Sequence, residues 1–274
     1  MRNSQTRPEM GRDGTQTMRR ASALLRLLAG RRELKLRLTE LAEQTALSRS
    51  TVHRILQGLV SEGWAVQDHR TAQYSLGPLA YEIGLAARPP SHLNKVAGSA
   101  LERLAAESGD TAFLSVRNDL DAVCIGRREG RFPIRALILD IGSRRPLGVG
   151  AGALALLMSI PDEEIHEVLL QMGARFAAYR TTADVVRRDV ERSRTLGYAF
   201  YEGHILPGHK GIALPFFDPY GQLAGALSIA AISDRISPAR RGELVRLIRS
   251  EVESVEVGLA NLTHRGTNPS TNHE

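Results

Sequence analysis

The stretch SRSTVHRILQGLVSEGWAV, residues 48–66, decides the fold of the N-terminal part of this chain. Its apolar residues recur with the three- and four-residue spacing that places side chains on one face of a helix. The residues on that face are Val52, Ile55, Leu56 and Leu59. Ser48 is a favourable N-cap residue, and Gly63 can supply a left-handed C-cap. The stretch therefore predicts an amphipathic helix that begins just after residue 48.

The opposite face of this helix is rich in hydrogen-bonding groups. It carries Arg49, Ser50, His53, Arg54 and Gln57. Such a face has two interpretations: it is an ordinary solvated surface, or it offers hydrogen bonds to a partner. The helix alone does not distinguish them, so the flanking sequence has to decide.

Two further helices and a hairpin are predicted around this segment. Apolar residues at helical spacing between Met18 and Leu28 predict the first helix, which ends at Gly30. Thr39 can N-cap the second helix. Residues 64–67 and 73–76 flank a polar turn, which predicts a short β-hairpin. Three helices followed by a hairpin make a winged helix-turn-helix.

The basic charge of the chain is concentrated in this same region. Residues 1–88 hold 14 Lys and Arg against 8 Asp and Glu, a net charge of +6, whereas residues 89–274 hold 22 of each kind. A basic module joined to a neutral one is typical of a domain that binds a polyanion such as DNA. The alternative is an arginine-rich tail without a function.

The turn, the cap, the hairpin and the charge together favour DNA binding over a solvated face. In a helix-turn-helix the N-terminal half of the last helix enters the major groove, where Arg49 can pair with guanine. Thr39 can help to bind a phosphate, and Arg70 at the hairpin tip can touch the backbone or the minor groove. The predicted DNA-binding residues are Thr39, Ser48, Arg49, Ser50, Thr51, His53, Arg54, Gln57 and Arg70.

A second domain follows the pair Pro89-Pro90, which forbids continuation of a helix. We expect a disordered tail over residues 1–17, the winged helix-turn-helix domain over 18–77, a linker helix over 78–91, the second domain over 92–262 and a disordered tail over 263–274. Within the second domain, strands are predicted at 111–117, 121–127, 134–139, 197–202, 209–217 and 223–232. Helices are predicted near 96–104, 151–159, from 161, over 182–196 and over 237–262. Helices covering one face of a largely antiparallel sheet make this an α+β domain.

The composition excludes several classes of protein. The single cysteine, Cys124, rules out an intramolecular disulfide and CxxC-type sites, which fits a reducing cytoplasm. The polar N-terminus is not a signal peptide, and no apolar run is long enough to cross a membrane. His204 and His209 are five residues apart with no cysteine nearby, which is not a recognised metal-binding pattern. We therefore expect a cytoplasmic protein without a metal, a cofactor or a membrane segment.

The chain resembles the IclR-type transcriptional regulators over about residues 18–262. The motifs that carry the resemblance are the Leu41-Ala42…Leu47-Ser48-x-Ser50-Thr51-Val52-His53-Arg54-Ile55-Leu56 core, Gly63-Trp64…Tyr74-x-Leu76-Gly77, Arg145-Pro146-Leu147, Arg194-x2-Gly197-Tyr198-Ala199, and Ile212-Ala213-x-Pro215-x2-Asp218-x2-Gly221. The resemblance implies a homodimer or homotetramer that binds a palindromic operator in double-stranded DNA. It also implies a GAF-like C-terminal domain that binds a small effector, often a carboxylate of a catabolic pathway.

The effector site is expected at the Gly-rich run that opens the helix near residue 151. The amides of Gly150, Ala151 and Gly152 can hold a carboxylate, although a close-packed Gly/Ala turn is the alternative. By the resemblance, further contacts fall on Glu202, Gly211 and Ser228. His204 and His209, for which no metal is expected, are instead expected to line this site or to cap strand ends. Members of the family that bind very small keto-acids often carry a cysteine near position 211 and a hydroxyl near 230. Here Gly211 and Ala230 are expected to enlarge the cavity, which favours a bulkier, aromatic acid.

The rival interpretation is a DNA-tethered enzyme that uses Cys124 as its nucleophile and a histidine as its base. No Cys-His signature or nucleophile elbow supports it. Cys124 lies on a predicted apolar strand, where a free cysteine is usually a small buried hydrophobic residue. We therefore expect a regulator and no catalytic residues.

Overall fold

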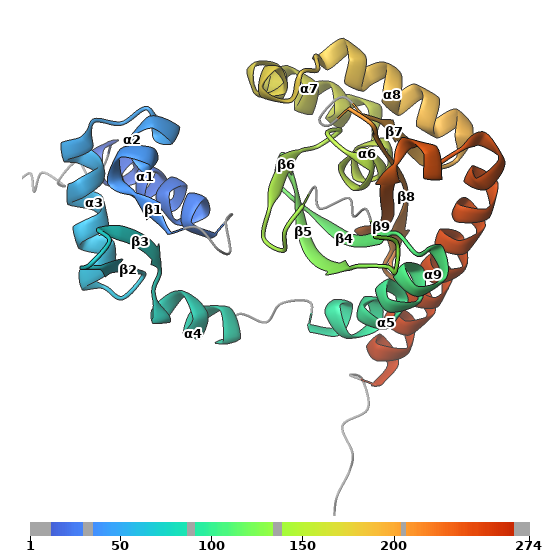
Figure 1. The fold of residues 1–274 in the computed structure, drawn as a ribbon, viewed down its shortest axis with the longest axis horizontal. Helices are drawn as coiled ribbons and strands as arrows, with labels where there is room; N and C mark the ends of the chain where they lie inside the picture. The colour runs from blue at the N-terminus through green and yellow to red at the C-terminus, as the bar shows by residue number, and fades with distance from the viewer. Residues whose placement is uncertain (1–11, 30–34, 87–90, 134–138, 204–206, 266–274) are drawn as a thin grey trace, which may run out of the picture. The chain divides into compact units, whose positions relative to one another are not determined.

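The computed structural model describes residues 12–29, 35–86, 91–133, 139–203 and 207–265 (Figure 1). The chain divides into two compact units, residues 1–88 and 89–274, and each has its own hydrophobic core. None of the described helices is long and apolar enough to cross a membrane.

The first unit is a winged helix-turn-helix. Its elements are α1 (Arg12–Ala29), β1 (Leu36–Arg37), α2 (Leu38–Thr45), α3 (Arg49–Ser61), β2 (Ala65–Asp68), β3 (Gln73–Leu76) and α4 (Pro78–Ala86). The three strands form an antiparallel sheet in the order β1-β3-β2. Leu24 of α1, Leu41 of α2, Leu56 of α3 and Tyr74 of β3 are all fully buried and share one core.

The ends of α3 are set by the residues that the sequence indicates. Ser48 precedes the helix in an extended conformation, and its Oγ accepts a hydrogen bond from the amide of Thr51 at 3.3 Å. Gly63 follows the helix with φ +75°, a left-handed conformation that glycine adopts without a steric penalty. The rotation of α3 about its axis is fixed by Val52, Ile55, Leu56 and Leu59, which are all buried.

The prediction that Thr39 caps α2 is wrong. The helix begins at Leu38 with Arg37 as its N-cap, so Thr39 already lies in the first turn. Arg37 belongs to β1, where it pairs with Gln73, and this short strand was not predicted because two residues carry no periodicity. The Glu40 carboxylate accepts a hydrogen bond from the Arg37 amide at 2.7 Å. This acidic group stands where a phosphate was expected.

The second unit is built on a six-stranded antiparallel sheet in the order β6-β5-β4-β9-β8-β7. Its elements are α5 (Ser91–Ser108), β4 (Thr111–Asn118), β5 (Asp121–Arg128), β6 (Arg144–Pro146), α6 (Ala151–Met158), α7 (Asp162–Phe176), a 3₁₀ turn (Ala177–Tyr179), α8 (Ala183–Leu196), β7 (Ala199–Glu202), β8 (His209–Phe217), β9 (Leu223–Ile232), a 3₁₀ turn (Ser233–Arg235) and α9 (Pro238–Arg265). The predicted strand at 134–139 lies outside the described residues except for Leu139. The three-residue β6 was not predicted.

Helices cover both faces of this sheet, so the expectation of a single covered face is wrong (Figure 1). One core joins α5 and α9 to large residues of the central strands, such as Ile212, Leu214 and Ile229. The other core joins α6, α7 and α8 to small residues, such as Ala213 and Ala226. The central strands carry apolar residues at consecutive positions because both faces of the sheet are buried. The small residues let α6 lie close to the sheet. The cavity described below lies at the start of this helix.

Candidate functional site

The exposed face of α3 is the first candidate site. Ser48, Arg49, Ser50, His53, Arg54 and Gln57 are all exposed, opposite the buried apolar stripe, and Thr51 is half-buried. The first turn of α3 contains no acidic residue. The structure therefore brings the predicted groups together as one basic, donor-rich ridge that a negatively charged partner can approach.

The hydroxyl groups at the start of α3 hydrogen-bond mainly to one another. Ser48 Oγ lies 3.1 Å from Ser50 Oγ and 2.8 Å from Thr51 Oγ1, in addition to accepting from the Thr51 amide. Ser48 and Thr51 are thus parts of the helix cap. The side chains left to face a partner are chiefly Arg49, His53, Arg54 and Gln57.

The hairpin turn after β2 is organised by Asp68, which the sequence analysis did not single out. Its Oδ1 accepts hydrogen bonds from the amides of Arg70 at 3.0 Å and Thr71 at 3.3 Å, and its Oδ2 lies 2.6 Å from Lys35 Nζ. The Lys35 hydrogen bond and then those from the turn lower the pKa of Asp68 to about 2. Arg70 is exposed at this turn. An Asp that precedes a polar turn is the signal that identifies this role.

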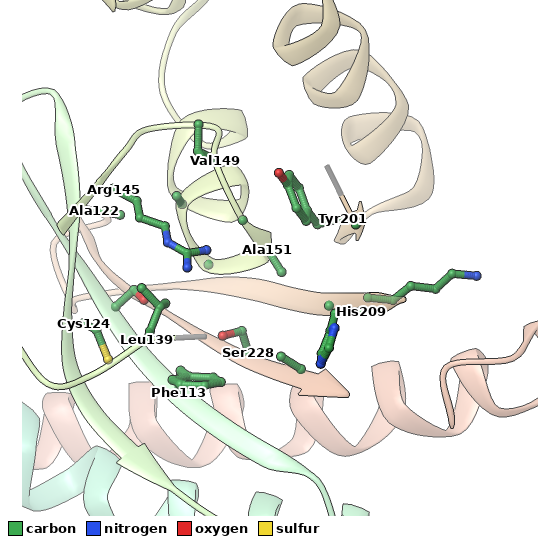
Figure 2. A pocket seen from close by; sticks show the side chains of 18 residues that line it. Phe113, Ala122, Cys124, Leu139, Arg145, Val149, Ala151, Tyr201, His209 and Ser228 are labelled. Atoms are coloured by element: carbon green, nitrogen blue, oxygen red, sulfur yellow. The ribbon is translucent and has the colours of Figure 1, made fainter. Parts of the chain in front are cut away.

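The second candidate site is a cavity in the second unit, between the start of α6 and the sheet (Figure 2). The cavity volume is about 50 Å³, counted as the space open to the centres of water molecules. On the same measure one water needs ~10–15 Å³, so the cavity has room for several. Its described lining residues are Phe113, Ser115, Ala122, Cys124, Leu139, Arg145, Val149, Gly150, Ala151, Gly152, Ala153, Tyr201, Gly203, His209, Lys210, Gly211, Ser228 and Ala230. The cavity can hold a compact organic molecule.

Most of the predicted effector residues line this cavity, but Glu202 does not. Gly150, Ala151, Gly152, Gly211 and Ser228 all contribute to the lining, as does His209. His204 lies outside the described residues. Side chains alternate along β7, so its neighbour Tyr201 faces the cavity instead of Glu202. The Glu202 carboxylate pairs with Arg192 at 3.2 Å and with Lys210 at 3.5 Å.

Two glycines allow α6 to lie close to the sheet. A Cβ atom on Gly152 would stand 2.9 Å from Ser115 Oγ, and one on Gly211 would stand 2.8 Å from the Ala151 Cβ atom. Gly211 lines the cavity, and Ala151 lies where a side chain at position 211 would stand. That Gly211 enlarges the cavity therefore stays a prediction. The Gly-rich run that opens α6 is thus packed closely against the sheet and also lines the cavity.

Arg145 is one of the lining residues that were not predicted from the sequence as site residues. It lies on β6, opposite Ala122 of β5, and its side chain extends into the cavity (Figure 2). Desolvation by burial lowers the pKa of its guanidinium group. None of the described lining residues is Asp or Glu, whereas Arg145 and Lys210 are basic. The cavity is therefore suited to an anion.

Cys124 is placed where a nucleophile is not expected. Its side chain is buried, its Sγ donates to the Gly126 carbonyl oxygen at 3.5 Å, and desolvation raises the pKa of the thiol to about 11. At neutral pH the thiol is therefore protonated and a poor nucleophile. Among the described residues, no group of three His, Cys, Asp or Glu side chains could hold a metal ion.

The exposed face of α3 and the cavity at α6 define a class of protein. Proteins of this class carry a winged helix-turn-helix and a separate domain with a cavity large enough for a small ligand. The sequence matches the family described as "Bacterial transcriptional regulator IclR C-terminal" over residues 89–257 and "IclR helix-turn-helix domain" over residues 17–69. The chain belongs to the IclR family. It is a DNA-binding transcriptional regulator and not an enzyme.

A known relative agrees with this assignment, and two solved structures share the fold. The chain is 31% identical over 202 residues to the HTH-type transcriptional repressor AllR of Klebsiella pneumoniae. The matched region covers 72% of this chain and 74% of AllR. An IclR regulator from Alicyclobacillus acidocaldarius has a similar fold, with a TM-score of 0.71 and 24% identity over 89% of this chain and 98% of its own. An IclR homologue from Microbacterium hydrocarbonoxydans, solved with 4-hydroxybenzoate, gives a TM-score of 0.69 at 21% identity, over 89% of this chain and 99% of its own.

The role of Asp68 can be tested with Asp68→Ala. Removing an acid from a DNA-binding unit should strengthen DNA binding by electrostatics alone. We expect the opposite, a loss of about two- to tenfold in affinity, because the turn that carries Arg70 loses its hydrogen bonds. Fluorescence anisotropy on a duplex selected from a random library measures the effect. Glu43→Ala, which removes an exposed acid from α2, is the matched control and should not weaken binding; equal behaviour of the two variants would refute the role of Asp68.

The environment of Cys124 predicts its reactivity. In the native protein at neutral pH, iodoacetamide should leave the thiol unmodified, whereas the thiol should react fully after unfolding in guanidinium chloride. Mass spectrometry of the intact chain distinguishes the two forms. Rapid labelling of the native protein would contradict the buried environment of the thiol.

Proposed function

We propose that the protein is a repressor that binds a palindromic operator as a homodimer or homotetramer and responds to a small organic acid. The observation that carries the DNA-binding part is the exposed ridge of Arg49, His53, Arg54 and Gln57 opposite the buried stripe of α3. Arginine reads guanine through O6 and N7 in the major groove, and glutamine reads adenine through N6 and N7. The ridge thus carries groups suited to base recognition as well as to phosphate contact.

The two-fold symmetry of a dimer determines that the operator consists of inverted repeats. A two-fold related pair of first units would place two α3 helices in major grooves about 34 Å apart, or a multiple of that distance. Such a pair recognises a site whose halves are inverted repeats. The wing, with Arg70 at its turn, would contact the flanking backbone and add affinity that does not depend on sequence.

The sign of regulation and the effector class are supported by the relatives. AllR of Klebsiella pneumoniae is named a repressor, and the Microbacterium hydrocarbonoxydans homologue was solved with an aromatic acid. In this chain the described lining of the cavity includes Arg145, Lys210 and the hydroxyl groups of two serines, and it contains no Asp or Glu. These groups can pair with an acid. The effector can change DNA binding only if its affinity differs between the two states of the regulator.

The DNA-binding proposal is tested by exchanging Arg49 and Arg70 separately for alanine. Arg49→Ala should cost about 1–3 kcal/mol on a selected operator and relax the preference at one base position, because a base contact is lost. Arg70→Ala should weaken binding to all sequences alike and reduce the salt slope by about one, because a phosphate contact is lost. Anisotropy titrations at several salt concentrations measure both effects. An Arg49→Ala variant with unchanged affinity and specificity would exclude α3 as the base-reading element.

A further inference from the structure

We propose that the outer face of the three-stranded sheet in the first unit is a second DNA-contact surface, which binds the phosphate backbone beyond the bases that α3 reads. This outer wing face consists of Lys35, Arg37, Asp68, Gln73 and Ser75, with Arg70 at the adjoining turn. The proposal rests on the proposed function, in which α3 reads the operator and Arg70 contacts the flanking backbone. It gives a role to Lys35 and Arg37, which were not predicted from the sequence as site residues.

The register of the three strands places the outer wing face on the side of the sheet away from the core. Arg37 of β1 pairs with Gln73 of β3, and Gln73 pairs with Asp68 of β2, so these residues form one row across the sheet. Side chains that are directly opposite one another in an antiparallel pair lie on the same face. Leu36 and Tyr74, the alternating neighbours in β1 and β3, are buried in the core. The row therefore lies on the opposite face, because side chains alternate along a strand.

Lys35, which directly precedes β1, is held over the outer wing face by an ion pair. Its Nζ donates to Asp68 Oδ2 at 2.6 Å, and since β3 lies between β1 and β2, the side chain crosses β3 to reach Asp68. An ammonium group has three N–H donors, and this hydrogen bond uses one of them. The Lys35 side chain is 49% exposed, so its other donors can reach a phosphate without loss of the pair. The pair also orders a long side chain before DNA binds, which reduces the entropy lost on binding.

The charges of the outer wing face favour a polyanion. Lys35, Arg37 and Arg70 are exposed. Asp68 and Glu40, which lie beside these cations, accept hydrogen bonds from Lys35 Nζ at 2.6 Å and from the Arg37 amide at 2.7 Å. The pKa of Asp68, about 2, keeps its carboxylate ionised and the pair with Lys35 formed at neutral pH. A surface of exposed cations whose neighbouring acids are already hydrogen-bonded attracts the phosphates of DNA.

Asp68 connects this surface to the turn that is proposed to contact the flanking backbone. One of its carboxylate oxygens binds Lys35, and the other accepts from the Arg70 amide at 3.0 Å, so both cations lie at the same end of the wing. If the turn contacts the backbone beside the half-site that α3 reads, the outer wing face meets the phosphates that follow. Contacts to phosphate add affinity but carry no sequence information. The protein should therefore use a longer stretch of duplex than its base contacts span.

The inference is tested with two duplexes that contain the same selected operator. The short duplex ends at the outermost base pairs that the selection specifies, and the long duplex adds about ten base pairs, one helical turn, of arbitrary sequence on each side. Fluorescence anisotropy should show that the full-length wild type binds the long duplex at least about fivefold more tightly than the short one. Equal binding of the wild type to both duplexes overturns the inference.

The residues are tested with the double variant Lys35→Gln/Arg37→Gln. This variant should bind the short duplex as the wild type does and lose the gain on the long duplex, together with part of the salt slope, because phosphate contacts are lost. Lys95→Gln/Arg187→Gln is the matched control: it removes two exposed cations from the second unit and should keep the gain. Lys35→Arg conserves the charge and should also keep it. A double variant that keeps the full gain refutes the assignment.

A structural role for the two cations would give a different result. If Lys35 and Arg37 only held the wing in place, the double variant would bind both duplexes more weakly by the same factor, which also refutes the inference. Failure of the proposed function is seen separately. An Arg49→Ala variant that binds the selected operator as the wild type does would exclude base reading by α3, whereas loss of the length dependence alone would leave base reading intact.

Discussion

The burial of one apolar stripe of α3 is the constraint on which the DNA-binding part of the structure depends. Val52, Ile55, Leu56 and Leu59 pack into the core shared with α1, α2 and β3, and this packing fixes the rotation of the helix. The remaining face of the helix is exposed. Recognition chemistry is therefore a direct consequence of core packing, and the Ser48 cap and the turn at Asp68 only refine where the polar groups lie.

In the second unit, the corresponding constraint is the close packing of α6 on the sheet. Small residues on the α6 side of the strands, together with Gly152 and Gly211, let α6 lie close to β8 and β9. The start of α6 then faces hydroxyl groups and the guanidinium of Arg145 across a small cavity. The same close packing that closes the core on this side thus creates a basic, partly apolar site, and a ligand in it would contact α6 and several strands at once.

The sequence predicted the elements whose signals are local and missed those that depend on tertiary contacts. Strong periodicity and clear caps predicted α3, and apolar runs bounded by turn residues predicted β8 and β9 with the ends that are observed. Thr39 failed as a cap because pairing of β1 with β3 extends the chain to Arg37. Glu202 and Arg145 could not be oriented, because which side of an edge strand meets a cavity is decided by the packing of α6. The second covered face of the sheet was missed because runs of small residues do not show which helix they contact.

The central claim is that the exposed ridge of α3 enters the major groove. Methylation protection by dimethyl sulfate tests it most directly, because the reagent attacks guanine N7, which lies in that groove. On a duplex selected from a random library, the protein should protect guanines in two inverted half-sites whose centres are separated by whole helical turns, and the Arg49 contact should account for one protected position in each half. Bound protein that leaves every guanine N7 open to methylation would contradict the account.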